Sequence, residues 1–224
     1  MTSFLTRAGY RSIAPLAGSV THVAGETTVL AALFAAVGHQ GDVWNYSVNH
    51  LERYATTMFS TQDAQVSGSP HALFTAQMHT LGRRIGQLHC VLAGADPGDP
   101  AFATEPLKSA DQSRWYSAIH FDADNVLRAL RGRMTALGDR QATAAQDLLA
   151  HAEPLLARLR ELCSGPVAGL KMRHHGNLHL GKVLLVADDF LLTGFEGNAA
   201  LTIEERRTKD SPLRDLYGDR KSVV

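Results

Sequence analysis

Residues 173–197 constrain the fold of this chain more than any other stretch. A polar loop, RHHGNLHLGK at 173–182, leads directly into an apolar run, VLLV at 183–186. An acidic pair, Asp188-Asp189, then precedes a second run, FLLTGFEG at 190–197. Two short apolar runs joined by a tight turn predict a β-hairpin. A loop crowded with histidine, glycine and asparagine before such a hairpin indicates a functional site, because few of these side chains favour a core.

The block resembles the catalytic loop and metal-binding hairpin of the maltokinases, sugar kinases related to the aminoglycoside phosphotransferases. That family's pattern reads HGDxHLGQ, then a hairpin, then DFEGE. The resemblance covers nearly the whole chain, and it implies an α+β, protein-kinase-like fold. The expected fold has a mainly helical C-lobe, a catalytic β-hairpin and only a remnant of the N-lobe sheet. Four further segments resemble the family in the same order: HQGDVW at 39–44, LERY at 51–54, GQLHCVLA at 86–93 and SPLRD at 211–215.

Three working positions of the family carry other residues here. In kinase-fold phosphotransferases, a loop aspartate accepts the proton of the substrate hydroxyl, while an amide and a second aspartate hold Mg²⁺. The resemblance puts Asn177, Lys182 and Gly194 at these positions. Asn177 has no carboxylate, Lys182 has no acceptor atom, and Gly194 has no side chain. The carboxylate left at this end of the hairpin is Glu196, two residues beyond Gly194 and therefore on the same strand face.

These residues define the expected site. Asn177 holds the position of the family's base, with His175 and His179 beside it in the loop, and these three are the predicted catalytic positions. Lys182, Gly194 and Glu196 mark the positions at or near the ligands of the family's cofactors, ATP and Mg²⁺.

The histidines of the loop also suggest a different kind of site. His174, His175 and His179 could bind zinc, because imidazole is a common metal ligand. A further ligand in a matching arrangement is not evident, since Cys163 is separated from the loop by Ser-Gly-Pro. Hydrogen bonds that organise the loop are therefore favoured over zinc, and no metal site is predicted.

The N-terminal part predicts a small strand pair. Residues 13–20 form a strand-like run, Gly25-Glu26 is a turn signal, and residues 27–34 are a second β-prone run, although the alanines that follow it would also suit a helix. Only a fragment of an N-lobe sheet is therefore expected, near residues 12–33.

By the resemblance, the ATP-binding hinge falls at residues 34–36. The chain then divides into residues 1–37, a residual N-lobe with the hinge, and residues 38–224, a helical C-lobe that is incomplete at its C-terminus. So short an N-lobe leaves no room for the lysine that contacts phosphates in the family. Mg·ATP is accordingly expected to bind no better than millimolar.

Helices are expected between these parts. Apolar residues at helical spacing predict a helix over 70–93, ended by a loop rich in proline and glycine. Ser109 with Asp111 suggests a cap for the next helix, and Pro154 should divide a third one. The expected inward residues are Phe74, Met78, Leu81, Ile85, Leu88 and Leu92 in the first helix. They are Trp115, Ile119, Val126, Leu127 and Leu130 in the second, and Leu148, Leu149, Leu155, Leu156, Leu159 and Leu162 in the third.

Composition excludes several classes of protein. The chain has 224 residues, 45% of them hydrophobic and 20% charged, and its formal net charge is zero. This is typical of a globular protein, and it gives no electrostatic reason to expect binding to nucleic acid or to a membrane. Cys90 and Cys163 fit a reducing compartment. No signal-peptide pattern is evident and the apolar run at 29–37 is too short to span a bilayer, so a cytoplasmic location is expected.

The resemblance implies ATP-dependent phosphorylation of maltose, giving maltose 1-phosphate for α-glucan synthesis. The substituted positions favour a catalytically impaired or inactive remnant, because loss of a general base typically lowers the rate by ~10²–10⁴. Two alternatives stay open. The chain could be active only with a partner that supplies the N-lobe. It could also be a non-catalytic module that binds maltose, a related disaccharide or a trehalose synthase, with Trp44 either stacked on a sugar or packed in the core.

Overall fold

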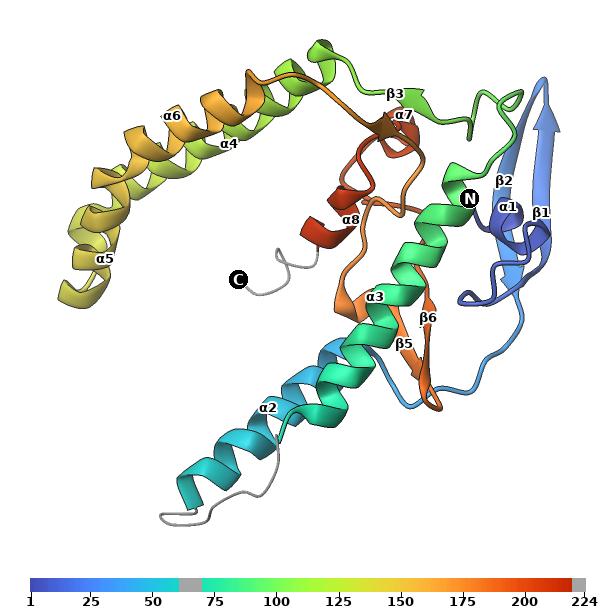
Figure 1. Ribbon diagram of the computed structural model, residues 1–224, viewed down its shortest axis with the longest axis horizontal. Helices are drawn as coiled ribbons and strands as arrows, with labels where there is room; N and C mark the ends of the chain where they lie inside the picture. Colours follow the sequence, from blue (N-terminus) through green and yellow to red (C-terminus); the bar gives the residue numbers. More distant parts are fainter. Residues whose placement is uncertain (61–69, 219–224) are drawn as a thin grey trace. The chain divides into compact units, whose positions relative to one another are not determined.

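The structure is a computed structural model that describes residues 1–60 and 70–218 (Figure 1). The described residues are mainly helical, with three separate two-stranded sheets, which confirms the α+β class. The chain forms two compact units: Met1–Glu105 with Lys171–Val224, and Pro106–Leu170. The lobe boundary expected between residues 37 and 38 stays a prediction.

The first unit carries both predicted strand pairs. Its N-terminal part contains α1 (Thr2–Arg7), β1 (Leu16–Ala24), β2 (Glu26–Phe34), α2 (Val43–Ser60) and α3 (Ala72–Ala93). Its C-terminal part contains a 3₁₀ turn, η2 (Leu180–Lys182), then β5 (Val183–Val186), β6 (Asp189–Leu192), α7 (Ile203–Arg207) and α8 (Leu213–Gly218). The chain enters and leaves the second unit through β3 (Glu105–Pro106) and β4 (Leu170–Lys171).

The long helix α3 follows the predicted apolar stripe. Leu81, Leu88 and Leu92 are buried, and Met78 and Ile85 pack partly against the same core. Their spacing of three and four residues puts them on one face of the helix. The helix ends at Ala93, where the predicted loop rich in glycine and proline begins.

The β5–β6 hairpin lies in the core of the first unit. Its turn is Ala187 and Asp188, with Ala187 in the left-handed region at φ 53°. Asp189 therefore begins β6 instead of lying in the turn as expected. Both outer edges are paired as well, because Leu192 N donates to Ser12 O at 2.8 Å and Leu185 N donates to Gly41 O at 2.9 Å.

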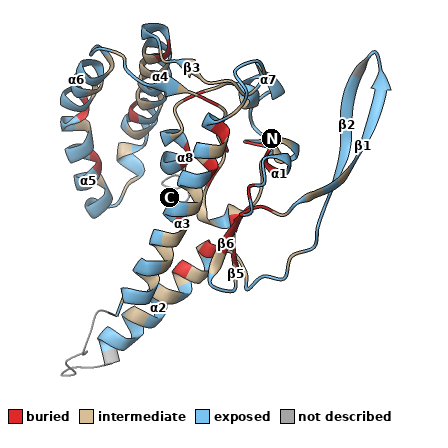
Figure 2. Ribbon diagram, turned by 45° about the vertical axis from the view of Figure 1, so that its right-hand side comes forward, coloured by how far each residue is buried: buried red, intermediate tan, exposed pale blue. Residues whose placement is uncertain are grey.

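The β1–β2 hairpin confirms the second predicted strand pair, with Gly25 in its turn at φ 82°. Strand β2 ends at Phe34, and the alanines that follow, Ala35 and Ala36, are not helical, so the helical alternative for them is wrong. Figure 2 shows both strands exposed along most of their length, in contrast to β5 and β6. Among its apolar residues, Val23 is 70% exposed and Leu33 is 66% exposed.

The second unit consists of three helices, α4 (Ser109–Arg133), α5 (Asp139–Ala150) and α6 (Ala152–Cys163), with a 3₁₀ turn, η1 (Met134–Ala136), after α4. The predicted division near Pro154 is confirmed: the proline lies in the first turn of α6, where its missing N–H costs nothing. Ser109 is the first helical residue, and the Asp111 carboxylate accepts from Lys108 N at 2.9 Å.

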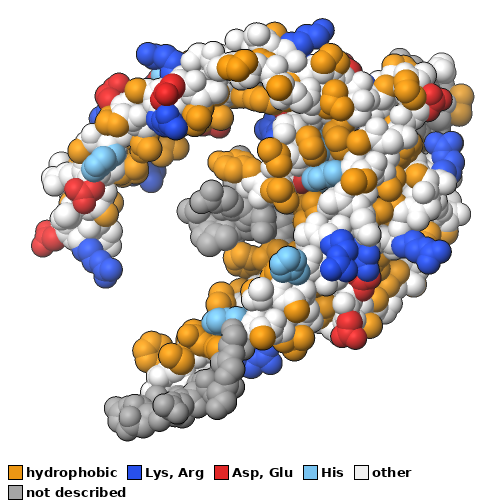
Figure 3. Space-filling view, viewed as in Figure 1, with side chains coloured by type: hydrophobic (Ala, Val, Ile, Leu, Met, Phe, Trp, Pro, Cys, Tyr) orange, Lys and Arg blue, Asp and Glu red, His pale blue; other side chains and the backbone are white. Residues whose placement is uncertain are grey.

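The expected inward residues of this unit are only partly buried. Leu127 is buried, but the prediction was wrong for Ile119 and Val126 in α4 and for Leu148, Leu155 and Leu162 in the third stripe, all of which are exposed. In the described unit, three helices form a single layer, so each helix covers only part of its neighbour's apolar stripe. Figure 3 shows apolar side chains at the surface along these helices.

No described helix combines the length and the apolar character that crossing a bilayer requires.

Candidate functional site

A buried carboxylate anchors the polar loop. Asp215, in α8, is only 1% exposed and accepts hydrogen bonds from His175 N at 2.9 Å and Gly176 N at 2.8 Å. The ring of His89, from α3, lies 2.9 Å from the same carboxylate. Burial alone would raise the pKa of Asp215, but the bonds from His89 and from the loop amides outweigh it and lower that pKa. Asp215 thus holds the loop as a carboxylate.

His175 is the most deeply buried of the predicted site residues, at 2% exposure. Its Nε2 lies 2.8 Å from Thr193 O, and since a carbonyl only accepts, Nε2 carries the proton. Its Nδ1 then accepts from Asn177 N at 3.4 Å. Burial lowers the pKa of His175, so the ring is neutral near pH 7. With both ring nitrogens engaged, the observed contacts of His175 fix the loop to the end of β6, while its catalytic role stays a prediction.

The other two histidines of the loop are placed differently. His174 has a buried Nδ1 with no hydrogen-bond partner among the described residues, and burial lowers its pKa. His179 precedes the η2 turn, where its carbonyl accepts from Lys182 N at 2.7 Å. Across residues 1–60 and 70–218, no group of three or more histidine, cysteine, aspartate or glutamate side chains could hold a metal ion. The loop histidines are therefore not gathered as a zinc site.

The three expected cofactor positions are brought together. Lys182 Nζ lies 3.1 Å from Glu196 Oε1, and the lysine stem lies over Gly194. A Cβ atom at position 194 would fall 2.6 Å from Lys182 Cδ and 2.8 Å from its Nζ. Any side chain at 194 would therefore displace the lysine. The ammonium and its stem occupy the space in which the family's metal-binding carboxylate would begin.

These residues do not fit Mg²⁺. The ion takes a near-octahedral set of oxygen ligands and is usually held by one or two carboxylates. Here the nearby carboxylate is Glu196, which already faces the Lys182 ammonium, and Gly194 offers no side chain. The pKa of Glu196 is nevertheless lowered: burial opposes this, but its own backbone amide and Lys182 outweigh burial. The anion of Glu196 is thus stabilised by the protein itself.

The N-terminal strands do not fit a phosphate clamp either. The first lysine of the sequence is Lys108, and neither β1 nor β2 contains a lysine or an arginine. The β1–β2 hairpin therefore presents no cationic side chain to the phosphates of a nucleotide.

A second set of contacts fixes the hairpin to α3, and sequence reasoning missed it. Arg84 binds Asp189 through two parallel bonds, Nε to Oδ1 at 2.7 Å and Nη2 to Oδ2 at 2.6 Å. This pairing lowers the pKa of Asp189. Tyr10 donates from its hydroxyl to Arg84 O at 2.7 Å, and burial raises the pKa of that hydroxyl to about 12. The turn end of the β5–β6 hairpin is therefore attached to α3 through Asp189.

Solved sugar kinases have the same fold. A glucosamine kinase in complex with glucosamine, ADP and inorganic phosphate superposes with a TM-score of 0.73 at 21% identity, over 96% of this chain and 48% of that chain. A second glucosamine kinase structure, crystal form B, gives a TM-score of 0.72 at 21% identity, over 98% of this chain and 46% of that chain. At this identity the likeness establishes the fold.

The sequence relationship points to the same kinases. A glucosamine kinase from Streptacidiphilus jiangxiensis is 24% identical over 215 residues, which is 96% of this chain but 43% of that protein. No family model matches the chain. The chain is thus homologous at low identity to a sugar kinase, and it spans less than half the length of this relative. The relationship supports a sugar-kinase-like family, whereas the narrower expectation of a maltokinase has no specific support.

Proposed function

We propose that this chain is a sugar-kinase-like protein whose loop does not by itself carry out magnesium-dependent phosphoryl transfer. The observation that carries the proposal is the Lys182 side chain, which lies over Gly194 and pairs with Glu196. The Lys182 ammonium therefore lies at the position where, by the resemblance, the family binds a divalent ion. Phosphoryl transfer depends chiefly on positioning and on charge neutralisation by metal ions, so this exchange removes most of the family's means of catalysis.

The residue at the base position supports the same conclusion. Asn177 can donate or accept a hydrogen bond from a sugar hydroxyl, but its amide cannot take up the proton. His175 cannot replace it, because Nε2 is protonated and faces Thr193 O while Nδ1 faces Asn177 N. Removing a general base typically costs ~10²–10⁴ in rate. Under this proposal, the chain has the loop and the β5–β6 hairpin, but neither Asn177 nor His175 serves as the general base.

The proposed ligand class is a sugar. Glucosamine is the first candidate, because the related kinases carry that name, and maltose or a related disaccharide is the second, from the motifs of the loop. The proposal predicts that the protein binds a sugar but does not phosphorylate it. Calorimetry with glucosamine and with maltose measures binding without requiring catalysis.

The deciding experiment is a coupled ADP-release assay with glucosamine and maltose, in the presence of Mg²⁺ or Mn²⁺. We expect no sugar-dependent release above the no-enzyme rate, whereas an active glucosamine kinase in the same mixture serves as the positive control. Calorimetry should give a dissociation constant for Mg·ATP no tighter than millimolar. Turnover near ~1 s⁻¹, an ordinary enzymic rate, or low-micromolar binding of Mg·ATP would overturn the proposal.

The exposed hairpin favours a second candidate function, a kinase that is active only with a complementing polypeptide segment. Val20 and Leu33 share one face of the β1–β2 hairpin, Val23 and Val29 share the other, and all four are more than half exposed. A two-stranded hairpin is at best marginally stable in water, and three or more strands usually share a buried face. Further strands would cover these residues and supply a phosphate-contacting lysine.

The two candidates differ in one assay. The N-lobe of a glucosamine kinase is added in trans to the natural chain and to a triple variant, Asn177→Asp, Lys182→Gln and Gly194→Asp. Activity of the natural chain with the added lobe would establish the second function and contradict the first. Activity of the triple variant alone would show that the three substitutions were the whole defect. Under the first proposal, the triple variant stays inactive alone and only its metal affinity rises.

A further inference from the structure

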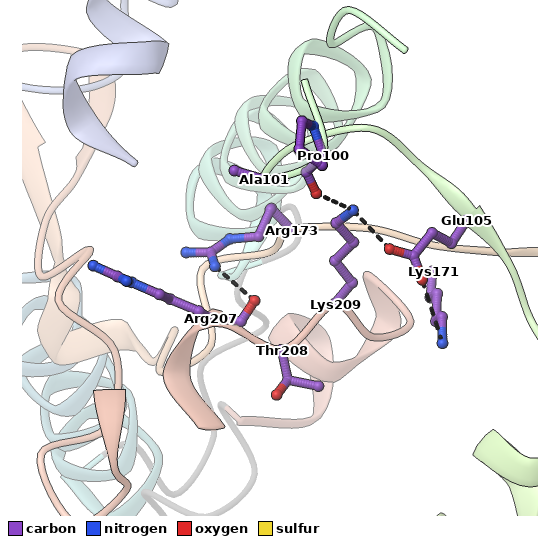
Figure 4. A pocket seen from close by; sticks show the side chains of 8 residues that line it. All are labelled: Pro100, Ala101, Glu105, Lys171, Arg173, Arg207, Thr208 and Lys209. Atoms are coloured by element: carbon purple, nitrogen blue, oxygen red, sulfur yellow. Dashed lines mark hydrogen bonds and ion pairs between the residues drawn. The ribbon is translucent and has the colours of Figure 1, made fainter. Parts of the chain in front are cut away.

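A pocket of about 320 Å³ lies within the first unit, and of the loop 173–182 only its first residue, Arg173, lines it. Figure 4 shows three segments around it: the chain beyond α3, the chain at and after β4, and the end of α7 with the residues that follow it. The pocket is lined by Pro100, Ala101, Glu105, Lys171, Arg173, Arg207, Thr208 and Lys209. Neither Asn177, Lys182 nor Glu196 belongs to the lining, so this is a separate site.

The single carboxylate of the lining is already neutralised. Lys209 Nζ lies 2.7 Å from Glu105 Oε1 and also donates to Pro100 O at 2.7 Å. Lys171 Nζ lies 3.6 Å from the other carboxylate oxygen, Glu105 Oε2. Hydrogen bonding to Lys209 is the main reason that the pKa of Glu105 is lowered. The two lysines and Glu105 thus form a paired group on one side of the pocket.

The two arginines of the lining have no such partner. Arg173 Nη1 donates to Arg207 O at 2.7 Å, and its guanidinium carbon lies 5.8 Å from the centre of the Phe102 ring. Within the described residues, no carboxylate pairs with either guanidinium. Figure 4 shows both groups on the same side of the pocket. Burial is the main reason that the pKa of Arg173 is lowered, and the charge of Arg207 lowers it further.

Charge and size together point to one ligand chemistry. The lining holds four cations and one carboxylate, so its formal excess is three positive charges. A guanidinium has five donors in a planar fork that matches phosphate oxygens, and Arg173 uses only one of them on a carbonyl. The pocket volume is at the lower end of the ~300–1,000 Å³ typical of small-molecule sites. That space accommodates a phosphoryl group together with a small organic part.

We propose that this pocket binds the phosphoryl group of a small anion, with Arg173 and Arg207 as the residues that take its oxygens. The ligand class is inorganic phosphate or a sugar phosphate, which share this group. The site requires no metal and no catalytic activity of the loop, so it is independent of the proposed function.

The test is calorimetry on the full chain with sodium phosphate, glucose 6-phosphate and glucose 1-phosphate, at an ionic strength held constant with sodium chloride. We expect saturable binding that weakens at least tenfold in Arg207→Gln, with an exposed side chain whose loss should not affect folding. The double variant Arg173→Gln/Arg207→Gln should show no binding. The matched control is Arg140→Gln, which removes an exposed arginine from α5 and should bind like the natural chain.

The three ligands distinguish inorganic phosphate from a sugar phosphate as the source of the phosphoryl group. Tighter binding of a sugar phosphate than of inorganic phosphate would support a site that also contacts the sugar. Equal binding would support a site for the phosphoryl group alone. Absence of saturable heat with all three probes overturns the proposal, as does equal weakening in Arg207→Gln and Arg140→Gln. Arg173→Lys keeps the charge but loses the fork, and it should bind more weakly than the natural chain.

Discussion

The chain contains two antiparallel hairpins of opposite character. In β5–β6 the strands have four residues each, yet their side chains reach the core and both outer edges are hydrogen-bonded to other segments. In β1–β2 the strands have nine residues each, and their apolar side chains are mostly exposed. Within the described residues, no other strand pairs with β1 or β2. Length and β-propensity do not distinguish the stable hairpin from the exposed one, but the surroundings do.

The two hairpins also differ in the side chains that they offer to a ligand. Residues in or next to the β5–β6 hairpin, such as His175 and Asp189, have several polar partners. The β1–β2 side offers exposed apolar area without any cationic side chain. The polar groups of the first region are thus held by the protein itself, whereas the apolar side chains of the second are largely uncovered.

The largest contrast is expected from truncating one large apolar side chain in each hairpin, buried in β5–β6 and exposed in β1–β2. Phe190→Ala, at 1% exposure in β6, should lower the free energy of unfolding by about 3–5 kcal/mol. Its matched partner, Leu33→Ala in β2, should change it by no more than ~0.5 kcal/mol. Guanidinium denaturation followed by circular dichroism measures both. Similar losses at the two positions would mean that β1–β2 is buried in solution.

The loop that leads into β5 depends on one carboxylate. Asp215→Asn keeps the size of the side chain but removes the charge that accepts from His175 N and Gly176 N, so we expect a loss of about 2–3 kcal/mol. The control is Asp188→Asn, in the exposed turn of the same hairpin, which should be neutral within ~0.5 kcal/mol. Equal effects in urea denaturation would show that Asp215 does not anchor the loop.

The residue after β6 gives a smaller effect. Gly194 has φ 79°, a region that costs a residue with a side chain roughly 1–2 kcal/mol. Gly194→Ala and Gly194→Asp should both show this loss in the free energy of unfolding, and both should displace Lys182. A double-mutant cycle with Lys182→Ala separates backbone strain from side-chain crowding. If the cycle shows no coupling, Lys182 does not lie over Gly194.

The last contrast concerns pH. Burial lowers the pKa of His174 and of His175. As the pH falls below about 6.5, these two histidines therefore bind protons more readily in the unfolded chain than in the folded chain. The free energy of unfolding should therefore decline from about pH 6.5 downward, by ~1.4 kcal/mol for each unit of pKa shift. The pKa of Asp215 is lowered instead, and its contribution is lost only below about pH 4.

Urea denaturation at pH 7.5, 6.5 and 5.5 checks the histidine prediction. His175→Gln should flatten the decline, although it also lowers stability at every pH. His22→Gln, on exposed β1, should leave the slope unchanged. A slope that does not respond to His175→Gln would assign the decline to other groups.

Local patterns in the sequence predicted α3, α4, the divided stripe of α5 and α6 and both hairpins, but not the helix α2. The stripe of α3 is a helix with one buried face, which periodicity detects directly. The apolar runs on either side of Ala187 form one strand pair, and those on either side of Gly25 form another. Short apolar runs separated by a turn signal predict such pairs. The three-helix unit was predicted less well, because periodicity shows which residues are apolar but not how many neighbours cover them. Leu155 and Leu162 have the same spacing as buried leucines and are exposed.

The sequence pointed to particular residues of the candidate site but not to their contacts, and the roles of these residues stay predictions. Substitution at Asn177, Lys182 and Gly194 was visible in the sequence, and the absence of suitable Mg²⁺ ligands followed from side-chain chemistry. That the Lys182 stem fills the space over Gly194 depends on packing across the hairpin. Asp215 contacts a loop 39 and 40 residues away in the chain, and no local pattern marks such a partner. The motifs also did not separate one sugar kinase from another.

The lysine over Gly194 also affects the order in which mutations could convert this loop into a metal-binding one. A carboxylate introduced at 194 while Lys182 remains must push the ammonium away from Glu196 and accept a strained backbone at once. Replacing Lys182 first meets neither obstacle, because the pair it forms is partly exposed and such pairs are worth only ~0–1 kcal/mol. The two substitutions are therefore epistatic. Directed evolution from this chain should acquire the change at 182 before the change at 194, and libraries that vary 194 alone should return glycine.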